Sequence, residues 1–366
     1  MVAVLLVVIL GCAALAVDIG YLYVARAELQ RTADAAAMAG AQALGRGADS
    51  PFGEYLYPDN IYTQAEAYAF SNKVVRQGIV LNRSTDITVG YLADIHDRSA
   101  TLQIVSLDQA NAVQVIARRI SGNGGEIPLF FAPIWGITSS GVGASAIAVL
   151  DDRFYAYAPK HIGGLSAMPF AVDEQTWNDE IIAGNGDDYY SYDDVSQSVS
   201  SSPDGVKEIK LYPEQNVAGN FGILHIGSGS NGVPILRDQI RNGISKDDFI
   251  DLTGQPMIEF YNYDSGAVVS RSISGNPGIK AGLKDAVEEK LGQKVAFFIF
   301  STVTGNGSNA VYTVVNMRFG RVMLVRLTGG DKAVIIQPVP HCGPDIIVSP
   351  NAPSTDKLIG TLQLVR

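Results

Sequence analysis

The first seventeen residues, Met1 to Val17, contain no charged side chain, and strong helix formers continue from there to about Gly45. A helix of that apolar length spans roughly 26 Å, just short of the ~30 Å hydrocarbon layer of a bilayer. One helix of about 45 residues would be roughly 67 Å long, which exceeds both a bilayer and an ordinary globular helix. Such a helix needs something to pack against, so it constrains the fold more than any other segment.

The flanks of the apolar run indicate how this helix begins and where it leaves a membrane. No lysine or arginine precedes the run, whereas a secreted chain normally starts with a basic segment, so we expect removal of a basic leader. Tyr21 and Tyr23 lie where an aromatic belt would meet the membrane surface, and the first basic residue, Arg26, follows them. The pattern therefore predicts a helix that inserts into a membrane.

The second half of the predicted helix carries a face of small residues. Ala33, Ala37 and Ala41 recur at four-residue spacing beside Gly40, and such a face lets another helix approach closely. Two main interpretations stay open: a single-pass anchor with an alanine-rich stalk, and a helix bundled with copies of itself in a filament core. A retained signal segment is the third.

Asp18 is the residue that separates these interpretations. A carboxylate at the centre of a bilayer costs on the order of 2.5–3.5 kcal/mol and usually has a partner, whereas at the interface it is solvated. We hypothesise that Asp18 meets a cation on a neighbouring subunit during assembly, either the N-terminal amine or Arg26. The residues predicted to act in assembly are Asp18, Tyr21, Arg26, Ala33, Ala37, Gly40 and Ala41.

The string GCAALAVDIGYLYVARAELQRTADAAAMAGAQAL (11–44) resembles the N-terminal signature of the bacterial TadE/TadG-like proteins of Flp (Tad) pilus assembly. An apolar helix runs through an AVD-G-Y block into an alanine-rich stretch. The resemblance extends to NAVQVIARRI (111–120), PLFFAPIWGI (128–137), GASAIAVLDDRF (143–154), GNFGIL (219–224) and the PGIK–NAVYTVV region. Pilins with a glutamate at the fifth mature residue differ from this chain, which has Leu5.

The resemblance implies a structural role without enzymatic activity. The expected protein is a pilin-like subunit or assembly component of a bacterial surface filament, located in the cell envelope and inserted in the inner membrane before assembly. Its expected partners are copies of itself in a helical filament, with no small-molecule substrate. A membrane-anchored surface adhesin or binding module, stabilised by calcium, is the rival, and an enzyme is the third alternative.

Length and charge bound the rest of the chain. At 366 residues it is long enough for two globular units besides the helix. The 27 basic and 37 acidic residues give a net charge of −10, which argues against nucleic acid and against charge-driven docking onto anionic lipid headgroups. Cys12 and Cys342 cannot plausibly reach each other, so no disulfide framework is expected.

We predict an α+β fold in which the long helix carries two mostly antiparallel α+β domains. The expected boundaries are a helix at 1–45, a first pilin-like domain at 46–157, a second β-rich domain at 158–342 and a C-terminal tail at 343–366 that wraps a neighbour or frays. Helical periodicity is present at 61–77 and, with Asn276 as cap and a stripe through Ile279, Leu283, Val287 and Leu291, at 276–291. Strands are expected at 86–92, 100–105, 112–119, 143–150, 206–212, 221–226, 257–263, 294–302, 310–317, 321–327 and 333–339.

Two segments of the second domain have the composition of ligand sites. Gly227 to Gly232 forms a G-x-G-x-x-G between a predicted strand and a predicted helix, and a plain connecting loop is preferred over dinucleotide binding because no parallel βαβ alternation follows. Between Gly184 and Gly205, carboxylates gather among Asn, Ser and Tyr; Ca²⁺ prefers such oxygens, and a solvated acidic loop is the alternative. The calcium candidates are Asp187, Asp188, Asp193 and Asp194, and no other cofactor is expected.

The four histidines lack zinc spacing, and His341 beside Cys342 is not expected to be catalytic.

Overall fold

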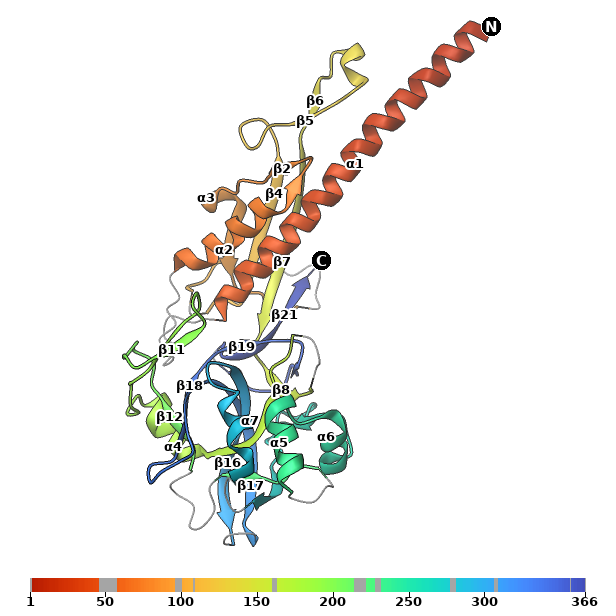
Figure 1. Ribbon diagram of the computed structural model, residues 1–366. Helices are drawn as coiled ribbons and strands as arrows, with labels where there is room; N and C mark the ends of the chain where they lie inside the picture. The colour runs from red at the N-terminus through yellow and green to blue at the C-terminus, as the bar shows by residue number, and fades with distance from the viewer. Residues whose placement is uncertain are drawn as a thin grey trace. The chain divides into compact units, whose positions relative to one another are not determined.

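A computed structural model describes residues 2–45, 58–95, 101–107, 109–159, 163–213, 222–227, 232–276, 281–305, 309–355 and 357–365. Close contacts divide the chain into two compact units, shown by chain position in Figure 1. Unit 1 comprises residues 1–44, 56–150 and 362–366, and unit 2 comprises residues 45–55 and 151–361. The second unit is thus inserted into the first in sequence.

Unit 1 is built on the long helix. Its elements are α1 (Val2–Leu44), α2 (Pro58–Ser71), β1 (Lys73–Val74), β2 (Gln77–Gly78), α3 (Arg83–Asp86), β3 (Ile87–Gly90), β4 (Ala112–Arg119), β5 (Ile127–Pro128), the 3₁₀ helix η1 (Ala132–Trp135), β6 (Ser139–Ser140) and β7 (Val142–Asp151). Strands β3, β4 and β7 form an antiparallel meander, which the end of β21 (Ile359–Val365) extends. The predicted helix to about Gly45 is confirmed.

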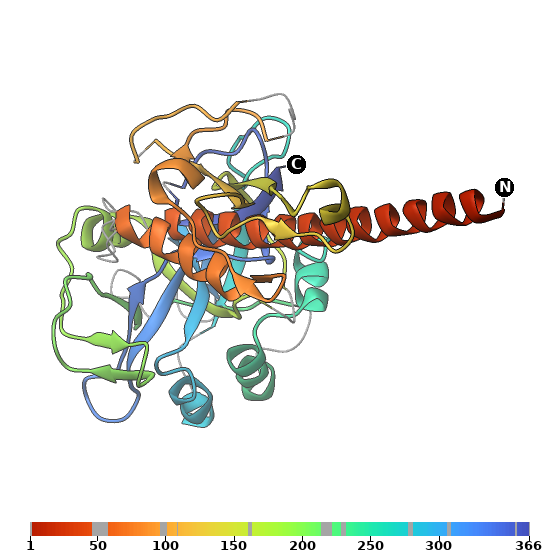
Figure 2. The ribbon, with the colours of Figure 1, turned by 90° about the horizontal axis from the view of Figure 1, so that it is seen from above.

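The second half of α1 packs inside unit 1, against α2 and β4. Ala33 and Ala37 on α1 and Ala65 on α2 are fully buried, because small side chains let the two helix backbones approach closely. The first half of α1 extends beyond the other elements of unit 1 (Figure 2). One helix therefore has a packed half and a projecting half.

Three predictions in unit 1 need correction. The helix expected at 61–77 ends at Ser71, since β-branched Val74 and Val75 follow and a tight turn with positive φ at Val75 and Arg76 joins β1 to β2. Among the described residues 101–105 of the strand expected at 100–105, only a bridge between Gln103 and Tyr91 forms. The PLFFAPIWGI segment (128–137), whose apolar composition predicts a short buried helix or loop, instead forms the exposed end of the β5–β6 hairpin.

Unit 2 contains most of the strands. Its elements are β8 (Phe154–Tyr157), β9 (Ala167–Asp173), α4 (Glu174–Trp177), the π-helix η2 (Asn178–Ile182), β10 (Ser191–Asp193), β11 (Ser198–Ser200), β12 (Ile209–Tyr212), β13 (Ile223–Leu224), α5 (Val233–Asn242), α6 (Lys246–Thr253), β14 (Ile258–Glu259), β15 (Arg271–Asn276), η3 (Ala281–Leu283), α7 (Lys284–Glu288), β16 (Lys294–Thr304), β17 (Val311–Arg326), β18 (Ala333–Pro338), β19 (His341–Cys342), β20 (Ile346–Val348) and the start of β21. Together with unit 1 they confirm the α+β class.

The main sheet of unit 2 closes on itself. Its order is β12-β18-β17-β15-β13-β9-β16, and β16 also pairs with β17, which joins five strands into a ring. Alternate residues of β16 serve two cores: Phe298 and Phe300 belong to one, and Phe297 and Ile299 pack with Trp177 in the other. The pair β9–β16 is parallel and the other pairs of the ring are antiparallel.

Several expectations for unit 2 are wrong in detail. The strands expected at 310–317 and 321–327 are one strand, β17, because β16 pairs with residues 311–321 and β18 pairs with residues 320–326, which carries the ladder across the expected break. Asn276 ends strand β15 instead of capping a helix, and Leu291 is half exposed beyond the short helix α7, whereas Leu283 and Val287 are buried as predicted. Beyond Gly343 the chain forms strands β20 and β21 within its own sheets, so the expected fraying tail is incorrect.

Candidate functional site

Asp18 is the centre of the most unusual contact in unit 1. Its side chain is almost completely buried, and its carboxylate accepts hydrogen bonds from three consecutive backbone N–H groups at the end of the β5–β6 hairpin. The donors are Phe130 to Oδ1 at 2.8 Å, Phe131 to Oδ2 at 3.0 Å and Ala132 to Oδ2 at 2.7 Å. A carboxylate of α1 thereby holds a loop that lies more than a hundred residues away in sequence.

The local sequence of the hairpin explains why those N–H groups need an outside acceptor. They lie at the start of η1, where helical N–H groups have no partner within the helix, and no side chain of the loop caps them. Pro133 opens η1 and Gly136, at φ 84°, ends it, so the turn is fixed on both sides. Asp18 acts as the missing cap, and the Tyr21 ring packs edge-on against Phe130 at 5.1 Å between centroids.

The end of this hairpin exposes apolar side chains to an unusual degree. We call residues 129–137 the hairpin tip; its exposed apolar residues are Phe130, Phe131, Ile134, Trp135 and Ile137. Beside it, α1 exposes a further set: Leu5, Ile9, Leu15, Val17, Ile19, Tyr23 and Val24. Neither set includes a charged residue, and the one carboxylate between them, Asp18, is withdrawn from the surface. Apolar patches of this kind on a protein surface mark interaction sites.

Over the residues whose side chains the structure describes, no helix has the length and hydropathy needed to cross a membrane.

The structure places the other predicted assembly residues in two different environments. Ala33, Ala37 and Ala41 are buried by α2 and β4 of the same chain, and a Cβ on Gly40 would lie 3.0 Å from Val113 Cγ1. Arg26 is exposed on α1. The cation expected near Asp18 is not among its hydrogen-bond partners in the described part of the chain; the backbone N–H groups take that place. The roles of these residues in assembly stay predictions.

A second small-residue face, which sequence reasoning passed over, lies on the projecting half of α1. Cys12, Ala16 and Gly20 recur at four-residue spacing and are all exposed. A Cβ added to Gly20 would meet no atom within 4 Å. This face is open to another helix, unlike the buried alanine face further along α1.

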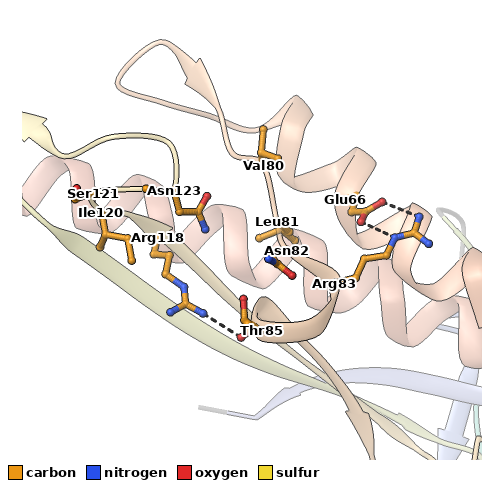
Figure 3. A pocket seen from close by; sticks show the side chains of 11 residues that line it. Glu66, Val80, Leu81, Asn82, Arg83, Thr85, Arg118, Ile120, Ser121 and Asn123 are labelled. Carbon is orange, nitrogen blue, oxygen red and sulfur yellow. Dashed lines mark hydrogen bonds and ion pairs between the residues drawn. The ribbon is translucent and has the colours of Figure 1, made fainter.

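Unit 1 also has a polar groove of about 600 Å³ between the segment that joins β2 to α3 and the turn after β4 (Figure 3). Arg83 on its rim forms a bidentate ion pair with Glu66, and Arg118 donates to the Thr85 carbonyl and to the buried Asp86. Both guanidinium groups are thus engaged by the chain itself. The groove therefore presents no ready anion site.

Two protein-family models match the part of the chain that contains α1 and the Asp18 contact. Residues 1–43 match the TadE/G-like Flp pilus-assembly model, and residues 27–148 match the Tad-like Flp pilus-assembly model. The N-terminal part of this chain belongs to the Tad family. The matched residues stop at 148, just before the main segment of unit 2 (151–361), so the resemblance expected at 219–224 and in the PGIK–NAVYTVV region lies outside them. No curated protein and no solved structure matches the chain.

Membership of the Tad family associates the chain with the Flp pilus at the cell envelope, and Tad proteins are assembly components. The matched residues include Asp18, Tyr21 and the hairpin tip. The Asp18 contact and the apolar surface beside it therefore belong to the Tad part of the molecule, whereas the ligand candidates described next belong to unit 2.

The four predicted calcium ligands of unit 2 are engaged separately by other groups of the chain. Asp188 accepts from the Asp204 and Gly205 N–H groups, and Asp193 accepts from two N–H groups of the turn between β10 and β11. Asp194 lies 3.4 Å from Arg321, away from both. Asp187 bridges to Glu208 through its backbone. Within the described ranges no three His, Cys, Asp or Glu side chains are placed to hold a metal ion, and calcium binding stays a prediction.

The remaining sequence motifs of unit 2 are placed as follows. Gly227 and Gly232 flank residues outside the described ranges, and α5 follows as expected, but β13 pairs antiparallel with both of its neighbours. The parallel arrangement of a dinucleotide fold is therefore missing around β13. His341 Nε2 lies 2.7 Å from Asp345 Oδ1, and His96 and His161 lie outside the described residues.

Glu208 is the titratable group of unit 2 that we expect to control its pH response. Burial, together with the negative charges of Asp188 and Asp204, raises the pKa of its carboxyl to about 7. Because the folded protein then binds a proton that the unfolded chain releases, stability is full below the unfolded pKa and falls as pH rises toward 7. We expect a loss of up to about 3 kcal/mol between pH 4.5 and pH 7.5.

Thermal melts across this pH range test the role of Glu208. The Glu208→Gln variant should lose most of the pH dependence, because glutamine does not ionise. Glu289→Gln, which removes an exposed carboxylate of the same unit, is the matched control and should keep the slope. An unchanged slope in Glu208→Gln would assign the pH dependence to another group.

Proposed function

We propose that the chain is a pilin-like component of Flp pilus assembly, held in the inner membrane before assembly by the first half of α1 and packed against copies of itself afterwards. The observation that carries this proposal is the charge-free apolar surface of α1 from Leu5 to Val24. Each large aliphatic side chain on that surface gains roughly 1.5–3 kcal/mol when it leaves water. The carboxylate of Asp18, which would oppose this transfer, is satisfied by three backbone N–H groups instead of water.

The face of α1 that meets a second copy is the one formed by Cys12, Ala16 and Gly20. Small residues at four-residue spacing allow two helix backbones to approach closely in an apolar environment. The alanines from Ala33 to Ala41 do not serve this purpose, because α2 and β4 of the same chain cover them. The contact between copies therefore uses the projecting half of α1.

Cysteine cross-linking tests this arrangement. In cells that produce the Cys342→Ser variant, Cys12 is the sole cysteine and is exposed on α1. Two parallel copies that meet through this face bring their Cys12 residues within the ~7 Å Cα separation that a disulfide requires. A membrane-permeable oxidant should therefore produce covalent dimers in the membrane fraction and in sheared filaments.

The matched control is Cys12→Ser with Cys342 retained, which should give no dimers. Monomers alone in the Cys342→Ser sample, with the chain present in the membrane fraction, would contradict packing between copies. That outcome would favour a membrane-anchored binding module.

A further inference from the structure

The hairpin tip has the chemistry of a membrane-interface contact and not of a solvated loop. From Ile127 to Thr138 the chain carries no charged side chain, and the side chains of Phe130 and Trp135 are each more than half exposed. Tryptophan and phenylalanine of this kind favour the headgroup and acyl boundary of a bilayer. The tip adjoins α1 at Asp18, within the apolar surface that runs from Leu5 to Val24.

The Asp18 contact fixes the conformation of the tip, so the loop cannot refold to bury these apolar side chains. Three consecutive amides are held by one buried carboxylate, and the Leu129 N–H donates to the Thr138 carbonyl across the base of the loop. The loop is thus fixed at both its centre and its base. Trp135 is therefore exposed because the hydrogen bonds of the loop hold it in this conformation, and not because the loop is disordered.

Charge is distributed in unit 1 in a way that fits an anionic surface beside the tip. Arg26 and Arg31 are exposed on α1, roughly 12 Å and 20 Å along the helix from Asp18. Lys73 and Arg76 are exposed on the β1–β2 hairpin. We call these four residues the basic collar.

The β1–β2 hairpin is fastened to the same stretch of α1, because the Val75 N–H donates to Glu28 Oε2 at 2.8 Å. Glu28, the acidic residue nearest the collar on α1, is thus already engaged. Helical side chains lean toward the N-terminus, so Arg26 points back toward the apolar surface. The net charge of −10 argued against docking on anionic headgroups, but it conceals this local basic cluster.

We propose that the hairpin tip is a second membrane contact, which lies in the headgroup layer of an anionic bilayer beside α1, with the basic collar facing the lipid phosphates. This inference rests on the proposed insertion of α1 and names the surface that accompanies it. Each collar residue near such a surface is attracted to the anionic headgroups, whereas the tip buries its apolar side chains in the bilayer. An apolar tip and a basic collar on the same unit match a bilayer, whose outer layer is charged and whose interior is not.

Two reporters in the full-length Cys342→Ser chain separate the tip from the helix. Trp135 is exposed at the tip, and the chain's other tryptophan, Trp177, is buried in unit 2 and insensitive to lipid. An environment-sensitive fluorophore on Cys12 reports on α1. The chain is added to vesicles of phosphatidylglycerol and phosphatidylethanolamine, with shallow brominated lipid as quencher, and to matched phosphatidylcholine vesicles.

The expected result is a blue shift and quenching of Trp135 on anionic vesicles, together with burial of the Cys12 label. The Trp135→Phe variant should lose the tryptophan response and keep the label response. Replacement of Arg26 and Arg31 by glutamine should weaken the tryptophan response by roughly fivefold in lipid concentration, as loss of one cation near the surface predicts, because the attraction falls off within a Debye length and Arg31 lies farther away.

Other outcomes overturn one proposal or the other. A buried Cys12 label with Trp135 still in water would overturn the tip contact and leave α1 insertion intact. A Trp135 response without any Cys12 response would overturn insertion of α1 and support the tip contact. A blue shift that needs no vesicles and grows with protein concentration would identify a second copy as the occupant and overturn the lipid contact.

Discussion

Asp18→Asn is expected to release the hairpin tip from α1. An amide offers one acceptor oxygen and turns its own N–H₂ toward the N–H groups of Phe131 and Ala132, so at least one donor loses its partner in a buried place. Amide exchange at residues 130–132 should accelerate by roughly two orders of magnitude, equivalent to about 3 kcal/mol. Hydrogen-exchange mass spectrometry of peptides that cover the tip measures this change.

The same variant should lose filaments while the chain still enters the membrane, because α1 keeps its apolar surface and loses only the fixed tip. Asp34→Asn is the matched control on the same helix; its carboxylate accepts from Gln30, and an asparagine oxygen can replace it. Normal exchange protection at the tip in Asp18→Asn would show that the carboxylate is not what holds the loop.

Two glycines of α1 should respond to the same substitution in opposite ways. A leucine at Gly40 would drive its side chain into Val113 and the Ile61 carbonyl, so we expect a cost of about 1–3 kcal/mol and a melting temperature lower by roughly 3–10 °C. A leucine at Gly20 meets no atom of its own chain and improves helix propensity. Its melting temperature should therefore stay the same or rise.

The Gly20→Leu variant should nevertheless lose Cys12 cross-linking by at least roughly tenfold, because the added side chain separates two helix backbones that pack through small residues. Gly40→Leu, folded at low temperature, should cross-link normally. Wild-type dimer yield from Gly20→Leu would mean that copies meet through another face of α1.

The sequence was sufficient for the long helix but not for the partners of its key residue. Helix propensity and the missing charges predicted α1 nearly to its last residue. Asp18 could be singled out as an anomaly, since a carboxylate in an apolar run needs a partner. The partners are backbone N–H groups, which every residue except proline carries, so no residue type in the hairpin reveals them.

The alanine face shows a different limit of sequence reasoning. Ala33, Ala37 and Ala41 correctly indicated a close helix contact, but spacing does not tell whether the second helix belongs to the same chain. Here it is α2, which carries its own buried Ala65 and Ala69. In the same way, the apolar composition of PLFFAPIWGI indicated a short buried helix or loop, while only the structure showed that most of its large apolar side chains are exposed.

Unit 1 is completed by both ends of the chain. The polypeptide leaves its sheet on β7, forms the main segment of unit 2 (151–361), and returns on β21 beside β7, in the opposite direction (Figure 1). The segment between β7 and β21 could therefore be exchanged in evolution or by engineering. A short turn that joins β7 directly to β21 would form a hairpin and leave α1, Asp18 and the hairpin tip in place. Related chains could therefore vary what they display between these two strands without redesigning how they are held.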